Sequence, residues 1–215
     1  MRFVKYSHSC VRIEAGDAVL VIDPGAFSEA ESLDGVDAVL LTHEHFDHLD
    51  INKLTDALAR RPEVRIFTHA DVVGKLGDLA PVTTTVAPGE AFTAAGLPVR
   101  AFGGLHAEIH RDVPRVTNLG FLVADALYHP GDSFDLPGDV TGVDTVFVPV
   151  SGPWLKISES VDFVRAIRPR RAVALHDCLL SDAGFLVTDG NMSKLSGCEY
   201  TRLAAGSGLP VSTMD

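Results

Sequence analysis

Short runs of apolar and β-branched residues, interrupted by single polar positions in the first two, follow one another at the start of the chain, a pattern typical of β-strands. The runs RFVKY, CVRIEA and AVLVID follow one another, and Gly16-Asp17 separates the last two. A Gly-Asp pair between two such runs favours a tight hairpin turn. We therefore expect a small antiparallel meander at the N-terminal end.

From Val36 onward, apolar runs are interleaved with segments of helical periodicity. Ile51, Leu54 and Leu58 recur on one face of a helix that we predict from about Asp50 to Arg60. The runs DTVFVPV and AVAL are almost continuously apolar, as in strands that are buried on both faces. The order of these elements predicts a mixed α/β protein.

The length of 215 residues is enough for one substantial core, so we expect a single domain over residues 1–215. Its motifs fall within residues 3–182, and residues 183–215, rich in Gly and Ser, predict a loop-rich extension of the same domain. No apolar run approaches the roughly 18 residues of a membrane span, and the N-terminus lacks the apolar core of a signal peptide. We expect a cytoplasmic protein with no membrane partner. The sequence leaves open whether the protein forms a homo-oligomer.

A formal net charge of −11 sets up a field that repels phosphate backbones. We therefore expect a small-molecule substrate and no nucleic-acid partner. Cys10, Cys178 and Cys198 show no CxxC spacing, which predicts free thiols and no thiolate zinc site. Cys178 is expected in the core.

The stretch THEHFDHLD is the densest group of metal-binding residue types, with three of the nine histidines inside six positions. Residues two apart in an extended chain point the same way, so His43 and His45 can share one metal ion. Asp47 and His48 follow where the chain turns and can reach a second ion. A polar loop with merely exposed histidines is the alternative, but distant partners occur in GGLHAEIH, YHPGDSF and ALHDC. Imidazole with carboxylate suits zinc, and manganese or iron are alternatives.

The motif HEHFDH fits the HxHxDH signature of the metallo-β-lactamase superfamily residue by residue, and the later pieces occur in that family's order. The resemblance covers roughly residues 3–182. SHSCVRIE and VLVIDP are similar to the branch that contains L-ascorbate-6-phosphate lactonase-like hydrolases. The resemblance implies a four-layer αββα sandwich, an α/β (α+β) fold in which two mixed sheets pack face to face with the metals at one edge.

The resemblance also implies a ligand set for two divalent metal ions. The first ion would be held by His43, His45, His106 and Asp132. The second would be held by Asp47, His48, His176 and the same Asp132, which bridges the two. His106 is preferred to His110 because Gly103-Gly104 lets the backbone bend toward the site, whereas His110 opens the charged run RDVPR.

The activity implied by the resemblance is hydrolysis, in which a hydroxide between the metals attacks an ester, lactone or related bond, with Asp47 and Asp132 as catalytic residues. A phosphodiesterase or nuclease is an alternative, which the lack of an inserted nuclease cap weakens. A non-catalytic metal-binding regulatory protein is another. Candidates for contact with the substrate are His8, His110, Trp154 and Lys156, against the alternatives of structural hydrogen bonding or surface packing.

Overall fold

Side chains along β3 (Ala18–Ile22) alternate between two hydrophobic cores. Leu20 and Ile22 enter one core, whereas Val19 and Val21 enter the other. A strand that is apolar on both faces must be covered on both. The sequence AVLVI therefore places β3 inside a layered molecule. The computed structural model describes residues 1–138 and 140–212.

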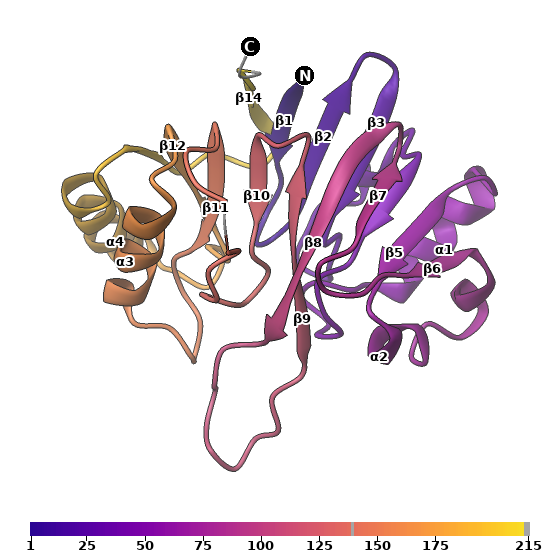
Figure 1. Cartoon of the computed structure of the whole chain (residues 1–215), viewed down its shortest axis with the longest axis horizontal. Coiled ribbons are helices and arrows are strands. Elements are labelled where there is room, and N and C mark those ends of the chain that lie inside the picture. Colours follow the sequence, from indigo (N-terminus) through magenta and orange to yellow (C-terminus); the bar gives the residue numbers. More distant parts are fainter. Residues whose placement is uncertain (139, 213–215) are drawn as a thin grey trace.

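Two mixed β-sheets lie face to face (Figure 1), each with seven strands in the described part of the chain. The first sheet has the order β14 (Ser207–Pro210), β1 (Arg2–Lys5), β2 (Val11–Ala15), β3, β4 (Ala38–Leu40), β5 (Arg65–Thr68) and β6 (Thr83–Thr85). The second has the order β13 (Glu199–Thr201), β12 (Arg171–Leu175), β11 (Thr145–Pro149), β10 (Leu127–His129), β9 (Thr117–Val123), β8 (Leu97–Leu105) and β7 (Ala91–Ala94).

Each sheet is antiparallel in one half and parallel in the other. β1, β2 and β3 form the predicted meander, and Ala15 pairs with Ala18 across the Gly16-Asp17 turn. The strands from β3 to β6 and from β10 to β13 are parallel. The predicted N-terminal hairpin is confirmed.

The central core fills the space between the sheets, where Phe3 and Phe147 meet edge to face with ring centroids 5.1 Å apart. Outer cores lie beneath the helices. α1 (Ile51–Arg60), α2 (Ala70–Val73), η1 (Ala30–Leu33) and η2 (Gly77–Val82) belong to the side of the first sheet, and α3 (Ile157–Ile167) and α4 (Asp182–Leu195) to that of the second. This arrangement confirms the predicted αββα fold.

Local signals explain where α1 begins and which face it buries. The side chain of Asp50 accepts hydrogen bonds from the backbone N–H groups of Asn52 and Lys53, which satisfies donors that a helix start leaves free. Leu54 and Ala57 are buried against the first sheet. α1 thus starts directly after the HxHxDH loop and fixes the end of that loop.

The prediction of a loop-rich segment over residues 183–215 is wrong. α4 covers Asp182–Leu195, with the Ser181 side chain accepting a hydrogen bond from the backbone of Gly184. β13 then joins the second sheet, and β14 pairs with β1 of the first. The C-terminal segment therefore completes one edge of each sheet.

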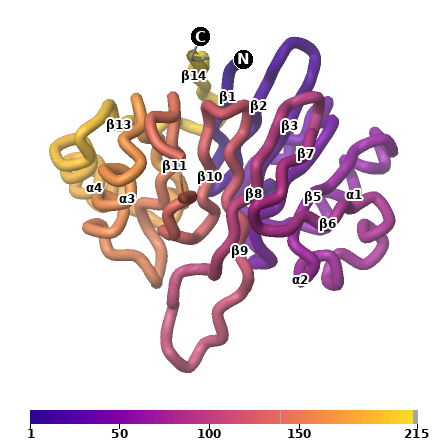
Figure 2. The backbone as a smooth tube through the Cα atoms, in the orientation of Figure 1, coloured from indigo at the N-terminus to yellow at the C-terminus, as the bar shows by residue number. Residues whose placement is uncertain are grey.

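The loop between β8 and β9, residues 106–116, projects beyond the ends of both sheets (Figure 2). The termini lie at the opposite end of the molecule (Figure 1). Within the described residues, no helix is both long and apolar enough to cross a membrane.

Candidate metal centre

Loops from both sheets supply the side chains of one cluster. The first sheet contributes the HxHxDH loop, which follows β4. The second sheet contributes His106 after β8, Asp132 after β10 and His176 after β12. β4, β10 and β12 each belong to a parallel part of a sheet, where the loops at the carboxyl ends of strands collect ligand sites. All seven metal ligands predicted from the sequence are brought together here.

Three histidines form the first candidate metal position, because ligand atoms of His43, His45 and His106 lie within 4.8 Å of one another. Nε2 of His43 is 3.1 Å from Nδ1 of His45. Asp132 adjoins this group, with Oδ2 at 3.3 Å from Nε2 of His106 and 4.0 Å from Nε2 of His43.

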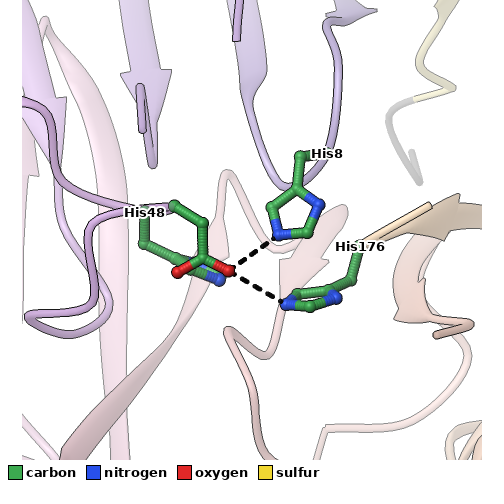
Figure 3. Close-up of side chains that lie close together, drawn as sticks. His8, His48 and His176 are labelled. Carbon is green, nitrogen blue, oxygen red and sulfur yellow. Dashed lines mark hydrogen bonds and ion pairs between the residues drawn. The ribbon is translucent and has the colours of Figure 1, made fainter. Parts of the chain in front are cut away.

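Four residues form the second candidate position: His8, Asp47, His48 and His176. Figure 3 shows His8 and His176 converging on one carboxylate, and the contacts join their Nε2 atoms to Oδ2 of Asp47 at 3.0 and 3.4 Å. Asp132 also reaches this group, with Oδ1 at 3.3 Å from Nε2 of His48 and Oδ2 at 3.1 Å from Nε2 of His176. Asp132 therefore lies between the two positions.

His8 has a place that the sequence did not assign to it. It was expected among residues that contact substrate, but its side chain is fully buried and its ring centroid lies 3.8 Å from that of His176. His8 has a φ of 62° and His176 a φ of 55°. Non-glycine residues adopt this left-handed conformation at a cost, and such residues collect at functional sites.

Asp23 is a functional residue that sequence reasoning missed. Its Oδ2 lies 2.8 Å from Nδ1 of His48 and accepts a hydrogen bond from the hydroxyl of Thr42, which in turn lies 2.9 Å from Nδ1 of His43. These contacts leave Nε2 of both histidines facing the cluster, and a carboxylate that accepts a hydrogen bond from the far nitrogen of a ligand histidine commonly fixes its ring orientation at metal sites. The signal was an Asp directly after the apolar run VLVI.

Gly25 permits a close approach of the Asp23 loop to the metal-binding loop. A Cβ atom at Gly25 would lie 1.9 Å from the carbonyl oxygen of Asp47, far inside van der Waals contact. Only glycine fits where two backbones approach so closely. Larger residues at this position would displace Asp47 and His48 from the cluster.

The charges in the cluster are strongly coupled. Burial alone would lower the pKa of His176, but the carboxylate of Asp132 overcomes this and raises the pKa to about 9. Burial likewise opposes ionisation of Asp132, yet His48 and His176 hold its pKa well below the usual range. Burial keeps the pKa of His43 well below its ordinary value, so this ring is neutral and able to bind a cation.

The donor set fits two divalent cations. Imidazole nitrogens and two carboxylates are ligands that zinc, iron and manganese accept. Oδ1 of Asp132 is buried and accepts no hydrogen bond of good geometry within the described part of the chain. A buried anionic oxygen without such a bond is costly, and a bound cation would satisfy it.

A pocket of about 530 Å³ opens beside the cluster. Its lining includes His45, Asp47, His106, Asp132 and His176, so a molecule in the pocket would touch both candidate metal positions. The volume lies in the range of small-molecule sites. Trp154, one of the predicted substrate contacts, also lines this pocket.

Two predicted substrate contacts lie elsewhere. His110 is 60% exposed in the projecting loop, where it contacts Asp112, because the charged run around it is solvated. Lys156 is exposed and lines a neighbouring pocket of about 430 Å³, which Trp154 also lines. The structure places neither residue in the pocket beside the cluster.

Cys178 is exposed, so its predicted place in the core is wrong. It follows β12 in the turn after His176, and its Sγ lies 3.0 Å from Nδ1 of His8. Cys10 is buried, Cys198 is half-buried, and all three cysteines are free thiols.

Residues 2–176 match the family described as the beta-lactamase superfamily domain. The chain therefore belongs to this superfamily, which confirms the resemblance carried by HEHFDH. Protein Rv0786c of Mycobacterium tuberculosis is 34% identical over 215 residues, covering 97% of this chain and 99% of that protein. A UPF0173 metal-dependent hydrolase of Pyrobaculum arsenaticum is 30% identical over 192 residues, covering 80% of this chain and 81% of that protein. Membership of the chain in the lactonase-like branch remains a prediction.

Solved structures share the fold at low sequence identity. Igni18, a metallo hydrolase from the archaeon Ignicoccus hospitalis, gives a TM-score of 0.76 at 17% identity and covers 100% of this chain and 99% of its own. CmlA, a diiron β-hydroxylase from Streptomyces venezuelae, gives 0.74 at 17% identity over 97% of this chain and 53% of its own. At these identities the likeness concerns the fold alone.

Proposed function

We propose that this chain is a metal-dependent hydrolase that cleaves an ester, a lactone or a related bond of a small molecule. The observation that carries the proposal is the position of Asp132, whose carboxylate lies within 3.3 Å of Nε2 of His48, His106 and His176. A carboxylate in this position can bridge two cations roughly 3.5–4 Å apart. The name of the relative from Pyrobaculum arsenaticum supports the same class of activity.

Two divalent cations, zinc in the first place and manganese or iron as alternatives, would acidify a water molecule and polarise the bond to be cleaved. The residues that would hold them are His43, His45 and His106 for the first, and His8, Asp47, His48 and His176 for the second, with Asp132 between them.

The protein itself contributes orientation and a proton acceptor. Asp23 and Thr42 fix the ring orientations of His48 and His43. Hydrogen bonds from His176 and His8 outweigh the effect of burial and lower the pKa of Asp47, which keeps this carboxylate ionised. Asp47 also lines the pocket, so it can accept a hydrogen bond from a water molecule there and orient it toward substrate.

Two features bear on the alternatives. The described residues that line the pocket include no Lys or Arg, which weighs against a nuclease, since polynucleotides are bound through basic side chains. The volume of about 530 Å³ weighs against a regulatory protein whose site admits only water. Both features favour a small-molecule substrate as the partner.

The experiment is a reconstitution followed by a substrate screen. Protein purified without chelator is loaded with zinc, manganese or ferrous iron, its metal content is measured, and lactones, carboxylic esters, thioesters and phosphodiesters are assayed. Asp132→Ala should lose both ions and all turnover, whereas His110→Ala should keep both ions. Turnover of phosphodiesters alone would replace the proposal with the nuclease alternative, and two bound ions without turnover would favour the regulatory protein.

A further inference from the structure

Four large apolar side chains surround the mouth of the pocket and are exposed to solvent. The exposed fractions are 41% for Phe27, 64% for Phe46, 38% for Ile109 and 52% for Leu179. Single exposed apolar residues are ordinary on a protein surface, but several around one cavity mark a binding site for an apolar group.

Three of these side chains come from the loops that supply metal ligands. Phe46 lies between two ligands of the HxHxDH loop, Ile109 follows His106 in the projecting loop, and Leu179 follows His176. The same loops thus orient the ligands toward the cluster and the apolar side chains toward the pocket. This arrangement connects the apolar mouth to the chemistry of the site.

Aromatic rings extend this apolar surface down to the ligands. Trp154 is 8% exposed, and its ring centroid lies 5.5 Å from that of His106 and 5.7 Å from that of His176. At the mouth, the rings of Phe27 and Phe46 meet edge to face at 5.4 Å. A chain of methylene groups could therefore run from the cluster to the surface along apolar contacts.

The described residues that line the pocket include no Lys or Arg to pair with an anionic substrate tail. The Asp and Glu residues of this lining are Glu44, Asp47 and Asp132. The nearby Lys75 is ion-paired with Glu44, and Arg115 donates hydrogen bonds to the carbonyl oxygens of His106 and Leu105. A carboxylate at the end of the substrate's tail would meet acidic and apolar groups, at an energetic cost.

We infer that the substrate is an uncharged carboxylic ester with a medium-length aliphatic acyl chain, which lies against Phe27, Phe46 and Leu179. The inference rests on the proposed function and specifies its substrate. Hydrolysis consumes one water molecule, whose oxygen forms a bond to the acyl carbon while the bond from that carbon to the ester oxygen breaks. The alcohol leaves with one proton of the water, and the fatty acid releases a proton to solvent.

The first test is a series of p-nitrophenyl esters cleaved by the zinc-loaded protein. From acetate through butanoate and hexanoate to octanoate, kcat/KM should rise by about tenfold or more, since each fully buried methylene is worth about 0.8 kcal/mol and part of the chain stays in contact with water. The p-nitrophenyl monoester of suberic acid has the same chain length as octanoate with a terminal carboxylate. It should be cleaved at least about tenfold less efficiently than octanoate.

Variants locate the preference in the pocket. Phe46→Ala and Leu179→Ala should each reduce the ratio of octanoate to acetate kcat/KM by about threefold or more, with metal content measured alongside. Leu186→Ala is the matched control, because Leu186 is 78% exposed on α4 and does not line the pocket. Equal efficiency along the series, or a preference for the suberate monoester, would overturn the inference but leave the proposed function intact.

A binding measurement tests the site for the aliphatic chain separately from the hydrolase activity. Trp154 is the one Trp in the sequence, so its fluorescence reports on this pocket. Titration with 1-octanol should give a saturable change that Phe46→Ala weakens and Leu186→Ala retains, and 1-butanol should give much less at equal concentration. If no ester is cleaved while this response is intact, the proposed function and the ester assignment are both wrong, and only the site for an aliphatic chain remains. If no saturable response is seen while esters are cleaved, the inference is wrong and the proposed function stands.

Discussion

Nε2 of His8 lies 3.0 Å from Oδ2 of Asp47, although 39 positions separate the two residues. His8 enters from the turn between β1 and β2, and Asp47 from the loop after β4. The first sheet thus supplies the second metal position from two separate turns. The HxHxDH motif contains only one of them.

His8→Ala should lower the metal content from about two ions toward one ion per chain, because the second position loses a nitrogen that contacts Asp47 and a ring that lies against that of His176. Inductively coupled plasma mass spectrometry measures this. His69→Ala is the control, since His69 caps α2 by accepting a hydrogen bond from the backbone of Asp71 and lies outside the cluster. Two tightly held ions in His8→Ala would contradict the placement of His8 as a ligand.

His106→Ala and His110→Ala should differ in metal content. His106 is 2% exposed and its Nε2 lies 3.3 Å from Asp132, so its loss should remove most of the first ion and nearly all activity. His110 is exposed beside Asp112, so its loss should leave both ions in place. Metal analysis of the two purified variants tests this prediction. Loss of the first ion in His110→Ala but not in His106→Ala would overturn the assignment of His106.

Asp23→Asn should weaken metal binding by about 10- to 100-fold, the usual effect of removing a carboxylate that orients a ligand histidine. The amide preserves the shape of the side chain but no longer supplies the charge opposite Nδ1 of His48. Competition with a chelator measures the affinity. Asp125→Asn, at an exposed carboxylate, serves as the control, and an unchanged affinity in Asp23→Asn would show that Asp23 has only a structural role.

The metal-free protein should lose stability as the pH rises from about 7 to 9. The pKa of His176 is raised from 6.5 to about 9 because Asp132 overcomes the effect of burial, so the proton on His176 stabilises the folded state. This contribution to the free energy of unfolding is on the order of 3 kcal/mol. It is fully present below pH 6.5 and is lost as the pH rises through about 9. Urea unfolding in the presence of a chelator measures it. His176→Gln should reduce the pH dependence but not abolish it, because the pKa of His48 is also raised well above its ordinary value by Asp132 and Asp23, which overcome the effect of burial. A wild-type stability that rises over this range would contradict the prediction.

Cys178 should react with iodoacetamide before Cys10 in the native protein. Cys178 is exposed, whereas Cys10 is fully buried. Burial and the carboxylate of Asp177 raise the pKa of Cys178 to about 11, so the reaction should be slow at pH 7.5 and should accelerate as the pH approaches 10. Mass spectrometry of timed samples locates the label. Unfolded protein prepared without reductant should show three thiols, and a disulfide would contradict the expectation of free thiols.

The parts of the fold that could be predicted from the sequence are those set by local patterns. The continuous apolar run AVLVI predicted β3, and Asp50 followed by apolar residues at helical spacing predicted α1. The Gly and Ser content of residues 183–215 predicts loop where the structure has α4. The apolar residues Phe185, Leu186 and Val187 of this helix are consecutive, so they form no apolar stripe at helical spacing that would indicate it. Met192 is the residue that α4 buries fully in the core. The helix depends on its Ser181 cap and on contacts that periodicity does not record.

The candidate site likewise contains some residues that local sequence patterns predict and others that only the structure places. The ligands of the HxHxDH loop are neighbours in sequence, so their spacing alone predicted a shared site. His8 and Asp23 reach the cluster because the strands from β1 through β4 pair in order and because both residues have a positive φ, 62° for His8 and 50° for Asp23. The sequence predicts the meander of β1, β2 and β3, but it does not predict the positive φ values that turn these two side chains toward the cluster. A structure was needed to place them.

The chain crosses from one sheet to the other between β6 and β7, near Pro88-Gly89, and each side of that crossing carries an incomplete set of ligands. The cluster exists only when the two sheets are docked. Bound cations would therefore hold the two sheets together, because separation of the sheets would break the coordination of the ions and release them. If the chain were cut at the crossing, neither fragment would bind the metals by itself as the whole chain does, and recovery of tight metal binding would report the moment at which the fragments reassociate.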